Sequence, residues 1–457
     1  MKKYTYYSTF FATTFFFVLN ASAFFKASLD TKFNYYLSPV QFTNLSQTIV
    51  NIKPRIIYSS KKNNKSNYFY ADIGALISSE LLDSHPIIPE LFFLYNLKST
   101  KFKNKTLVFG RKKIKWSLLE ENWKLGLLEP YFNANPLRPE KQGLFGIFYK
   151  QVTTNFLFRL FASPIFLPHQ SGAVDLKNGN IKVHNRWNSF IYYDTAVGKK
   201  INYSLQDIDI YNFLQKWSLG LWAKKKIFNF GSRKNNQTMY LTASYFYKPY
   251  SDPYVYVNIS DKAGDTTKPL DVLVKIKSVM HHIAFFEMQL KQKNFSEYIS
   301  VAIDKPKKLS FLNNAKYSAL VNKNILAFGF KYKNLFRGIN FGGIYTKFNI
   351  IQQSVFSAEK DLRGIDDIYG YPYKTAFFVK ANQKNILFAS DEFFVKYTQI
   401  LSSKVDILSI KYTKTLKNHI LTLGFDILGH PFSEQVGGVF ASNVSNDFIY
   451  IGWKYQL

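Results

Sequence analysis

Residues able to perform catalysis or to hold a metal ion are scarce in this sequence. None of the 457 residues is a cysteine, which excludes disulfides, thiolate-bound metals and a thiol nucleophile. The G-x-S-x-G pattern of a serine nucleophile elbow is missing as well. His281 and His282 are adjacent in an apparent strand, so their side chains point to opposite faces and cannot share a metal ion. We therefore predict a protein that is not an enzyme and has no catalytic, cofactor or metal site.

Two polar clusters contain metal-binding residue types but lack a suitable spacing. His430 and Glu434 lie on either side of Pro431 and are typical of a polar turn rather than of a zinc site. An acidic loop also contains Lys360 and Arg363, and its spacing does not match that of an EF-hand calcium loop. Its acidic residues are Glu359, Asp361, Asp366 and Asp367. A solvated loop is the preferred interpretation of this segment.

The sequence is strongly basic. Lys and Arg (60) outnumber Asp and Glu (30), which gives a formal net charge of +30. Such a charge is typical of nucleic-acid-binding proteins when the bases form blocks or a basic helix face. Here the lysines are scattered through strand-like segments, so we predict no nucleic-acid partner. Lys, Asn, Phe, Tyr and Ile are all abundant, and the codon bias of an AT-rich genome is an alternative explanation for the charge.

The elements that must position these residues are strands. Clean alternation of apolar residues with polar or small ones occurs in segments 155–162, 238–248, 283–291, 325–332, 392–398, 405–414 and 419–427. Short breaks separate consecutive strands and no helix-length amphipathic segment lies between them, so we expect an antiparallel meander. One face carries large aromatic and aliphatic side chains, and the other is richer in Gly, Ala, Ser, Thr and Lys. This division favours a barrel with a lipid-facing exterior and a hydrated lumen over a soluble sandwich.

Longer irregular segments interrupt the meander at residues 118–143, 164–185, 260–270 and 357–373. Barrels of this kind have short turns at one end and long loops at the other, and one loop can fold inward as a constriction. We therefore predict an all-β fold, a single antiparallel transmembrane β-barrel of about 16–18 strands with long outer loops.

The N-terminal segment is typical of an export signal. Lys2 and Lys3 form a positive start, residues 4–19 form an aromatic and aliphatic hydrophobic region, and Ala21-Ser22-Ala23 fits the small-x-small rule for cleavage. We predict that residues 1–23 are a cleaved signal peptide and that residues 24–457 form one barrel domain.

The C-terminal segment, residues 447–457, alternates like a closing strand. Trp453 and Tyr455 fall on its apolar face, and Lys454 falls on the other. This segment resembles the assembly signal of Gram-negative outer-membrane β-barrel proteins, although Leu457 stands where a terminal Phe is usual. The resemblance implies a bacterial outer membrane as location. It also implies the outer-membrane insertion machinery, outer-membrane lipid and lipopolysaccharide as partners.

A second, shorter segment also resembles large outer-membrane barrels. Residues 107–117 contain Gly110-Arg111 followed by Ile114 and Trp116, a pattern similar to that of porin-like and exporter-like barrels. In those proteins this segment joins an N-terminal strand to an inner loop. The resemblance supports the class of protein and does not identify a substrate.

The strand phases place seven basic residues on the predicted lumen side and only two acidic ones, Glu287 and Asp426. Rings of bases lower the electrostatic cost of anions in a pore. The bases are Arg159, Lys248, Lys291, Lys331, Lys396, Lys411 and Lys454. An equally acceptable interpretation is that these lysines only keep a wet interior hydrated.

These observations favour an outer-membrane channel for passive passage of small hydrophilic solutes, with a weak selectivity for anions. One alternative is an outer-membrane hydrolase or lipid-modifying barrel, because folding can bring Ser and His together without a sequence signature. The other is a surface adhesin or structural barrel with a plugged pore, in which the long loops carry the function.

Overall fold

The computed structural model describes a large part of the chain. The described residues are 24–37, 46–60, 67–79, 85–97, 105–170, 174–177, 180–183, 195–196, 199–207, 209–230, 237–260, 270–307, 322–333, 346–357, 375–384, 388, 390–401, 405–429 and 446–457. The predicted signal peptide, the acidic loop at 359–367 and the His430–Glu434 pair lie outside this part.

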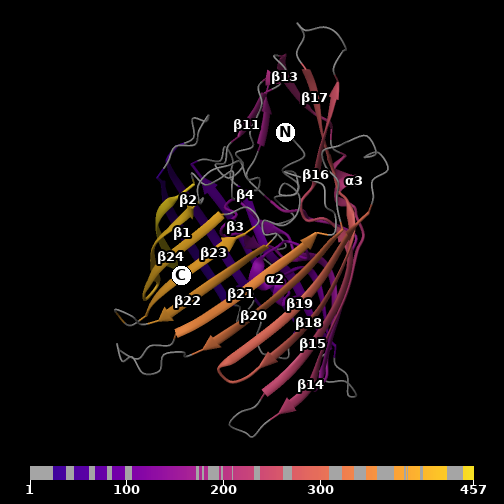
Figure 1. Ribbon diagram of the computed structural model, residues 1–457, viewed down its shortest axis with the longest axis vertical. Coiled ribbons are helices and arrows are strands. Elements are labelled where there is room, and N and C mark those ends of the chain that lie inside the picture. Colours follow the sequence, from indigo (N-terminus) through magenta and orange to yellow (C-terminus); the bar gives the residue numbers. More distant parts are fainter. Residues whose placement is uncertain are drawn as a thin grey trace.

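Eighteen strands form one sheet that closes on itself (Figure 1). Every neighbouring pair in this sheet is antiparallel, and β1 pairs with both β2 and β26, which leaves no free edge. The prediction of a single antiparallel barrel with about 16–18 strands is confirmed. The strands of the barrel are β1 (Phe24–Tyr36), β2 (Thr48–Ser59), β3 (Tyr68–Ser78), β4 (His85–Leu97), β5 (Lys105–Lys112), β8 (Leu144–Val152), β9 (Phe156–Ser163), β14 (Ser218–Phe230), β15 (Gln237–Pro249), β18 (Met280–Lys291), β19 (Phe295–Pro306), β20 (Lys323–Lys333), β21 (Thr346–Ser357), β22 (Thr375–Lys384), β23 (Asp391–Ile400), β24 (Val405–Leu416), β25 (His419–Gly429) and β26 (Phe448–Gln456).

The period-two pattern of the sequence sets which face of each strand points outward. Where β1 and β26 close the barrel, Phe33 pairs with Ile451, and both side chains are more than half exposed on the outer face. Asn34 and Tyr450 pair on the inner face, and both are buried. Large aromatic and aliphatic side chains continue around the outer face on the other strands, so the outside of the barrel is apolar.

The two ends of the barrel differ. At one end, which we call the short-turn end, neighbouring strands are joined by tight turns such as residues 153–155, 292–294 and 417–418. At the opposite, loop end, longer segments connect neighbouring strands (Figure 1). Residues 113–143 connect β5 to β8, and residues 164–217 connect β9 to β14. This arrangement matches the predicted combination of short turns and long loops.

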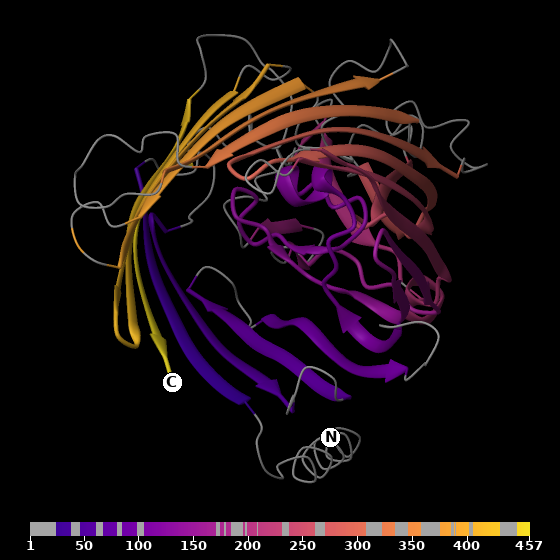
Figure 2. The same ribbon diagram turned by 90° about the horizontal axis from the view of Figure 1, so that it is seen from below.

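One long segment lies inside the barrel. Residues 113–143, which we call the plug, connect β5 to β8 and contain α2 (Leu118–Trp123), β6 (Tyr131–Phe132) and β7 (Glu140–Lys141). Seen along the barrel axis, the plug lies within the ring of strands (Figure 2). The expectation that one loop folds inward is therefore fulfilled by residues 118–143, the first of the four irregular segments.

Beyond the loop end, further short elements form small sheets (Figure 1). Strands β10 (Val174–Lys177) and β11 (Asn180–Val183) form a hairpin within a segment expected to be irregular, because four-residue strands are too short to show alternation. A four-stranded sheet joins β12 (Thr195–Ala196), β13 (Lys199–Leu205), β17 (Leu270–Lys277) and β16 (Tyr254–Ser260), and α3 (Ile210–Leu214) follows β13. In the described residues, no helix has the length and apolar character needed to cross a membrane.

Candidate functional site: the plug and the basic cavities

The plug begins with a short capped helix. The Ser117 hydroxyl accepts a hydrogen bond from the backbone N–H of Glu120, as an N-cap residue does. The helix ends at Lys124, which adopts the left-handed conformation with φ 52°. Gly126 also has a positive φ of 75°, and a Cβ there would meet the His169 ring at 2.4 Å. These two residues turn the chain back into the barrel.

Apolar side chains of the plug pack against the barrel wall. Leu119 and Leu128 are fully buried, and the Trp116 ring meets Phe246 edge-on with ring centroids 5.0 Å apart. The Trp123 ring lies 4.8 Å from that of a second wall residue, Phe378. Burying a large apolar side chain contributes about 2 kcal/mol. The lumen therefore contains a hydrophobic core, which a simple water-filled pore does not have.

Glu287 of β18 holds the start of α2. Its carboxylate accepts hydrogen bonds from the Ser117 hydroxyl at 2.6 Å and from the backbone N–H groups of Leu118 and Leu119 at 2.8 and 3.3 Å. Ser300 of β19 donates a fourth hydrogen bond at 2.9 Å. A carboxylate at this position satisfies N–H groups that the helix itself leaves free. The acidic charge of Glu287 is thus used to attach the plug to the wall.

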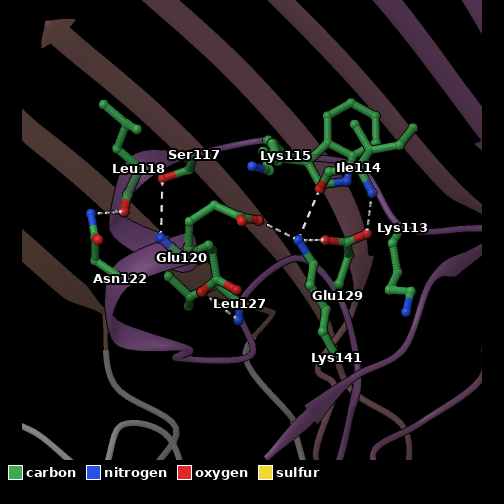
Figure 3. Close-up of polar contacts among 12 residues, drawn as sticks. Lys113, Ile114, Lys115, Ser117, Leu118, Glu120, Asn122, Leu127, Glu129 and Lys141 are labelled. Atoms are coloured by element: carbon green, nitrogen blue, oxygen red, sulfur yellow. Dashed lines mark hydrogen bonds and ion pairs between the residues drawn. The ribbon is translucent and has the colours of Figure 1, made fainter. Parts of the chain in front are cut away.

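Lys141 connects the two ends of the plug (Figure 3). Its ammonium group binds the carboxylates of Glu121 and Glu129 and donates a hydrogen bond to the backbone oxygen of Ile114 at 3.0 Å. Glu129 also accepts a hydrogen bond from the Ile114 N–H at 2.8 Å, and Glu120 accepts one from the N–H of Leu127 at 3.0 Å. These contacts link four polar side chains of the plug to one another or to its backbone, and Glu120 and Glu129 among them are buried.

The acidic side chains of this cluster have shifted pKa values. Burial raises the pKa of Glu129 to about 8 against the opposing effect of Lys141, and burial raises that of Glu120 to about 7. Burial lowers the pKa of Lys141, but Glu129 and Glu121 more than offset this effect, so that the pKa of Lys141 is raised. The cluster therefore retains protons to a higher pH than isolated side chains do.

Ion pairs join the far part of the plug to the wall. Arg138 pairs with Asp426 of β25 at 2.5 Å, and the Asp426 side chain is fully buried. Glu140 pairs with Lys53 at 2.9 Å and with Arg55 at 3.1 Å, both on β2. Breaking a buried pair by removing one partner leaves an uncompensated charge. The plug is thus attached to β18, β25 and β2, on different sides of the barrel.

Three of the cavities that the described residues line border the plug. The first, of about 530 Å³, lies between α2 and the wall residues Trp222, Lys291 and Tyr298, beside the short turn at 292–294. The second, of about 390 Å³, is bounded by the plug and by β22, β23 and β24. The third, of about 230 Å³, lies between the plug and β1, β2 and β3. The first two share Glu121 and Asn122 of α2 as lining residues, so they are neighbours.

Basic side chains outnumber acidic ones around each cavity. Five lysines and two glutamates are among the described residues that line the first cavity, and one of these glutamates is the hydrogen-bonded Glu287. Four lysines and Arg138 line the second cavity, with Glu121 as its acidic residue. Arg138 also lines the third cavity, together with two lysines, an aspartate and a glutamate. Glu121 is itself paired with Lys141.

Four of the seven basic residues singled out in the sequence line these cavities. Lys291 and Lys331 line the first cavity, and Lys396 and Lys411 line the second. Lys248 also lies on the inner face, but it is fully buried beneath the plug and donates hydrogen bonds to the Leu127 backbone oxygen and the Ser251 hydroxyl.

The other two basic residues have different surroundings. The guanidinium of Arg159 lies 4.5 Å from the centre of the Trp222 ring and donates a hydrogen bond to the backbone oxygen of Lys115. Lys454 pairs in register with Asp30 across the closing strands β1 and β26; Asp30 lines the third cavity, but Lys454 is not among the residues that line the three cavities. That any of the seven residues acts on a solute stays a prediction.

The residues of the predicted assembly signal lie on the closing strand. Trp453 is partly exposed, and its ring N–H donates a hydrogen bond to His419 at 3.1 Å. Tyr455 stacks on the Trp453 ring at 6.2 Å. Leu457 is largely exposed, and its backbone N–H donates a hydrogen bond to the Ala27 oxygen. The role of these residues in assembly stays a prediction.

Several cavity residues were missed from the sequence. Lys224 shares the inner face of β14 with Gly220 and Trp222, and the alternation of that strand could have revealed it. Lys380 of β22 could have been found in the same way. Three others, Lys115, Lys124 and Arg138, belong to the plug, where no regular period exists to reveal their direction.

The adjacent histidines of β18 lie on opposite faces of the strand. His281 faces inward and is hydrogen-bonded to Asp304 at 2.7 Å, whereas His282 contacts the Tyr245 hydroxyl on the outer side. The two rings thus point to opposite faces, as the alternation indicates. Within the described ranges, no group of three or more His, Asp or Glu side chains is arranged to hold a metal ion.

Comparisons with known proteins do not assign this chain to a family. No protein family and no curated protein matches this sequence. Solved structures of Rhodopseudomonas blastica porin variants are similar to it. One triple mutant is 9% identical, with 95% of this chain and 100% of the porin covered, at a TM-score of 0.39. A second triple mutant is 8% identical over the same shares, at a TM-score of 0.38. The prediction of an antiparallel β-barrel is confirmed by the closed sheet itself.

Proposed function

We propose that this protein is a bacterial outer-membrane channel for small hydrophilic solutes, in which the plug narrows the lumen and basic side chains favour anions. The closed sheet with an apolar outer face supports a location in a membrane, because a barrel leaves no backbone group unpaired in lipid. The export signal and the C-terminal strand expected from the sequence support the outer membrane. In this orientation the short-turn end faces the periplasm.

A single observation carries the proposed passage. The first and second cavities both border Glu121 and Asn122, and the second and third both border Arg138. Neighbouring cavities therefore follow one another along the plug, from the short turns towards the barrel interior beside β1 and β2. We infer that a solute entering at the short-turn end passes through these neighbouring cavities and so goes around the plug.

The charge along this path supports selection of anions. Basic side chains exceed acidic ones around each of the three cavities, and two of the acids, Glu287 and Glu121, are engaged by the plug. Fixed positive charges in a narrow, low-dielectric passage raise the local concentration of anions and lower that of cations. Lysines that only hydrate the wall would give no such preference.

Ion selectivity in planar bilayers tests this function. With a KCl gradient across the membrane, we expect a reversal potential on the anion-selective side. Replacing Lys291 and Lys411 with Gln is expected to shift the reversal potential towards that of a non-selective pore. The matched control replaces Lys225 and Lys305, which are exposed on the outer face, with Gln and should change nothing. A cation-selective reversal potential, or folded protein that does not conduct, would refute the proposal.

A surface-binding role is the second candidate, and one observation favours it. Strands from two different loops pair to form the four-stranded sheet beyond the loop end, where β13 and β17 run parallel. A four-stranded sheet at this position can present a binding surface to the exterior. Replacing residues 171–207 with a short linker should abolish binding to cells if this role is correct, while conductance through the barrel should persist. Unchanged cell binding would exclude the role.

A further inference from the structure

The two short helices of the structure differ in how far their apolar side chains are buried. In α2, Leu119 and Trp123 are buried between the plug and the wall. α3 has four apolar residues among its five, yet none of them is buried. Ile210 and Tyr211 of α3 are 67% and 68% exposed. A helix this short is not stable in water by itself, so packing of its apolar side has to contribute most of its stability.

The ends of α3 are fixed at the loop-end rim of the barrel (Figure 1). The Asp209 side chain caps the helix by accepting a hydrogen bond from the backbone N–H of Asn212 at 3.1 Å. At the other end, the backbone oxygen of Leu214 accepts a hydrogen bond from the N–H of the buried Phe166 at 2.8 Å. Phe166 follows β9, which ends at Ser163. The helix is therefore attached to the first residues that leave the barrel wall.

The exposed apolar surface at α3 leads directly to the outer face of the barrel. Only Gln215 and Lys216 separate the helix from Trp217, which precedes β14 and is 62% exposed. Trp217 is in phase with Leu219, which is 52% exposed on the outer face of β14. Along the strand, Trp217 lies about 7 Å beyond Leu219. We call the following residues the rim patch: Ile210, Tyr211, Trp217 and Leu219.

The residue types of the rim patch suit the boundary between lipid and water. Tyr and Trp are enriched at membrane interfaces, because their rings are apolar while their O–H and N–H groups need polar partners. Asp209, Asn212 and Lys216 alternate with the patch along the chain. Helices that combine apolar and polar residues in this way lie in the plane of the interface. Leu219 belongs to the face that contacts lipid in the proposed location, so the patch extends that contact towards the headgroups.

We propose that the rim patch is a lipid-binding surface that lies in the membrane leaflet at the loop end. Acyl chains contact its aliphatic residues, and the headgroup region surrounds its two aromatic rings. The Gln206 N–H, between β13 and α3, donates a hydrogen bond to the Val274 oxygen of β17. The contact with lipid therefore also holds the four-stranded sheet at a set height above the membrane. This inference rests on the proposed membrane location and not on the passage of any solute.

Single-cysteine labelling tests the proposal directly, because the chain contains no cysteine. The full-length barrel is labelled at one position with an environment-sensitive fluorophore and folded into vesicles of phosphatidylcholine with brominated acyl chains. The label at Ile210→Cys should be quenched severalfold more strongly by the brominated lipid than by iodide in the water. Phe286→Cys, on the outer face within β18, is the control for contact with lipid. Asp271→Cys, exposed at the start of β17, should be quenched by iodide instead.

The quenching pattern separates the rim patch from the membrane location. Iodide quenching at position 210 with lipid quenching at position 286 would overturn the lipid contact of the patch alone. Iodide quenching at both positions would overturn the membrane location itself. A label at position 210 that neither quencher reaches would show that protein covers the patch, for example a second copy of this chain, and would also overturn the proposal.

Protease digestion in the same vesicles tests whether the lipid contact holds the loop. The I210S/Y211S variant should be cleaved severalfold faster within residues 164–217 than the wild type, because the helix loses its contact with lipid. Gln215→Ser, at an exposed position next to the helix, is the matched control and should be cleaved like the wild type. Heat-modifiable migration on gels verifies that each barrel is folded. Equal cleavage of I210S/Y211S and the wild type would contradict the proposal.

Discussion

The barrel wall and the plug share one lumen but are stabilised in different ways. In the wall, each strand is hydrogen-bonded to two neighbours, and one side-chain period repeats around the whole sheet. The plug has a helix of six residues and two strands of two residues, and its position depends on a few buried side chains and ion pairs. Losing one interaction in the wall therefore removes a small part of the stabilisation of the wall. Losing one interaction in the plug removes a large part of the stabilisation of the plug.

The largest expected effect comes from removing the plug. Replacing residues 116–141 with a short Gly-Ser linker should leave the barrel folded, because its strands are paired without the plug. Single-channel conductance in planar bilayers should rise severalfold. Heat-modifiable migration on gels gives the control for folding. A variant that no longer folds would show that wall and plug are one cooperative unit and would contradict the comparison.

A smaller loss is expected when one anchor of the plug is cut. Arg138→Ala leaves the fully buried Asp426 carboxylate without its partner, which should destabilise the docked plug by about 3 kcal/mol. Hydrogen exchange of plug amides should accelerate while that of wall amides does not. The R138A/D426A double variant should recover part of the loss. If hydrogen exchange accelerated equally in the plug and in the wall, the Arg138–Asp426 pair would not be an anchor of the plug alone.

The pH dependence of plug docking should follow the enclosed carboxylates. Burial raises the pKa of Glu129 to about 8 and that of Glu120 to about 7, above the ordinary value of 4.5. The docked plug therefore binds protons more tightly than the solvated plug. The resulting stabilisation is complete below about pH 4.5, declines as the pH rises towards 8, and is lost above it.

Each of the two groups can contribute at most about 1.4 kcal/mol per pH unit to this decline. Protease digestion of the plug in folded protein measures it, and digestion should become faster between pH 5 and pH 8. Glu129→Gln should flatten the profile. Slower digestion at higher pH would show that the carboxylates are ionised in the docked plug.

The smallest effect is expected in the wall. Lys417, in the turn between β24 and β25, has φ 47°, which glycine adopts without strain. Lys417→Gly should therefore stabilise the barrel by less than about 1 kcal/mol. Denaturant unfolding of the whole barrel measures this gain, and plug digestion should not change. An effect on the plug would mean that the two regions are coupled through the short turns.

The sequence allowed prediction of the wall much better than of the plug. Segments such as 238–248 and 419–427 alternate with period two, so their strands and faces could be assigned before the structure was known. Gly110-Arg111 pointed to an inner segment, and the structure shows that Gly110 has φ 116° next to the buried Arg111.

No sequence pattern comparable to the alternation of the wall strands indicates the contacts of the plug. Glu287 could be placed on the inner face by alternation, but its partners Ser117 and Leu118 are separated from it by more than 160 residues. The pair Lys380–Lys396 depends on the register of two strands, which a single sequence does not specify beyond the face. Long-range pairing between irregular and regular segments is therefore what sequence reasoning could not supply.

The pairing of β1 with β26 also constrains the order of folding. Residues near opposite ends of the sequence become neighbours, so this contact has a very high contact order and its loop-closure entropy is lost late. Until β26 arrives, β1 presents an unpaired edge that can recruit other chains. A newly made barrel protein therefore needs a chaperone that covers the edge of β1 until β26 pairs with it. Circular permutants that join residues 24 and 457 should still close, because these ends lie at the same rim.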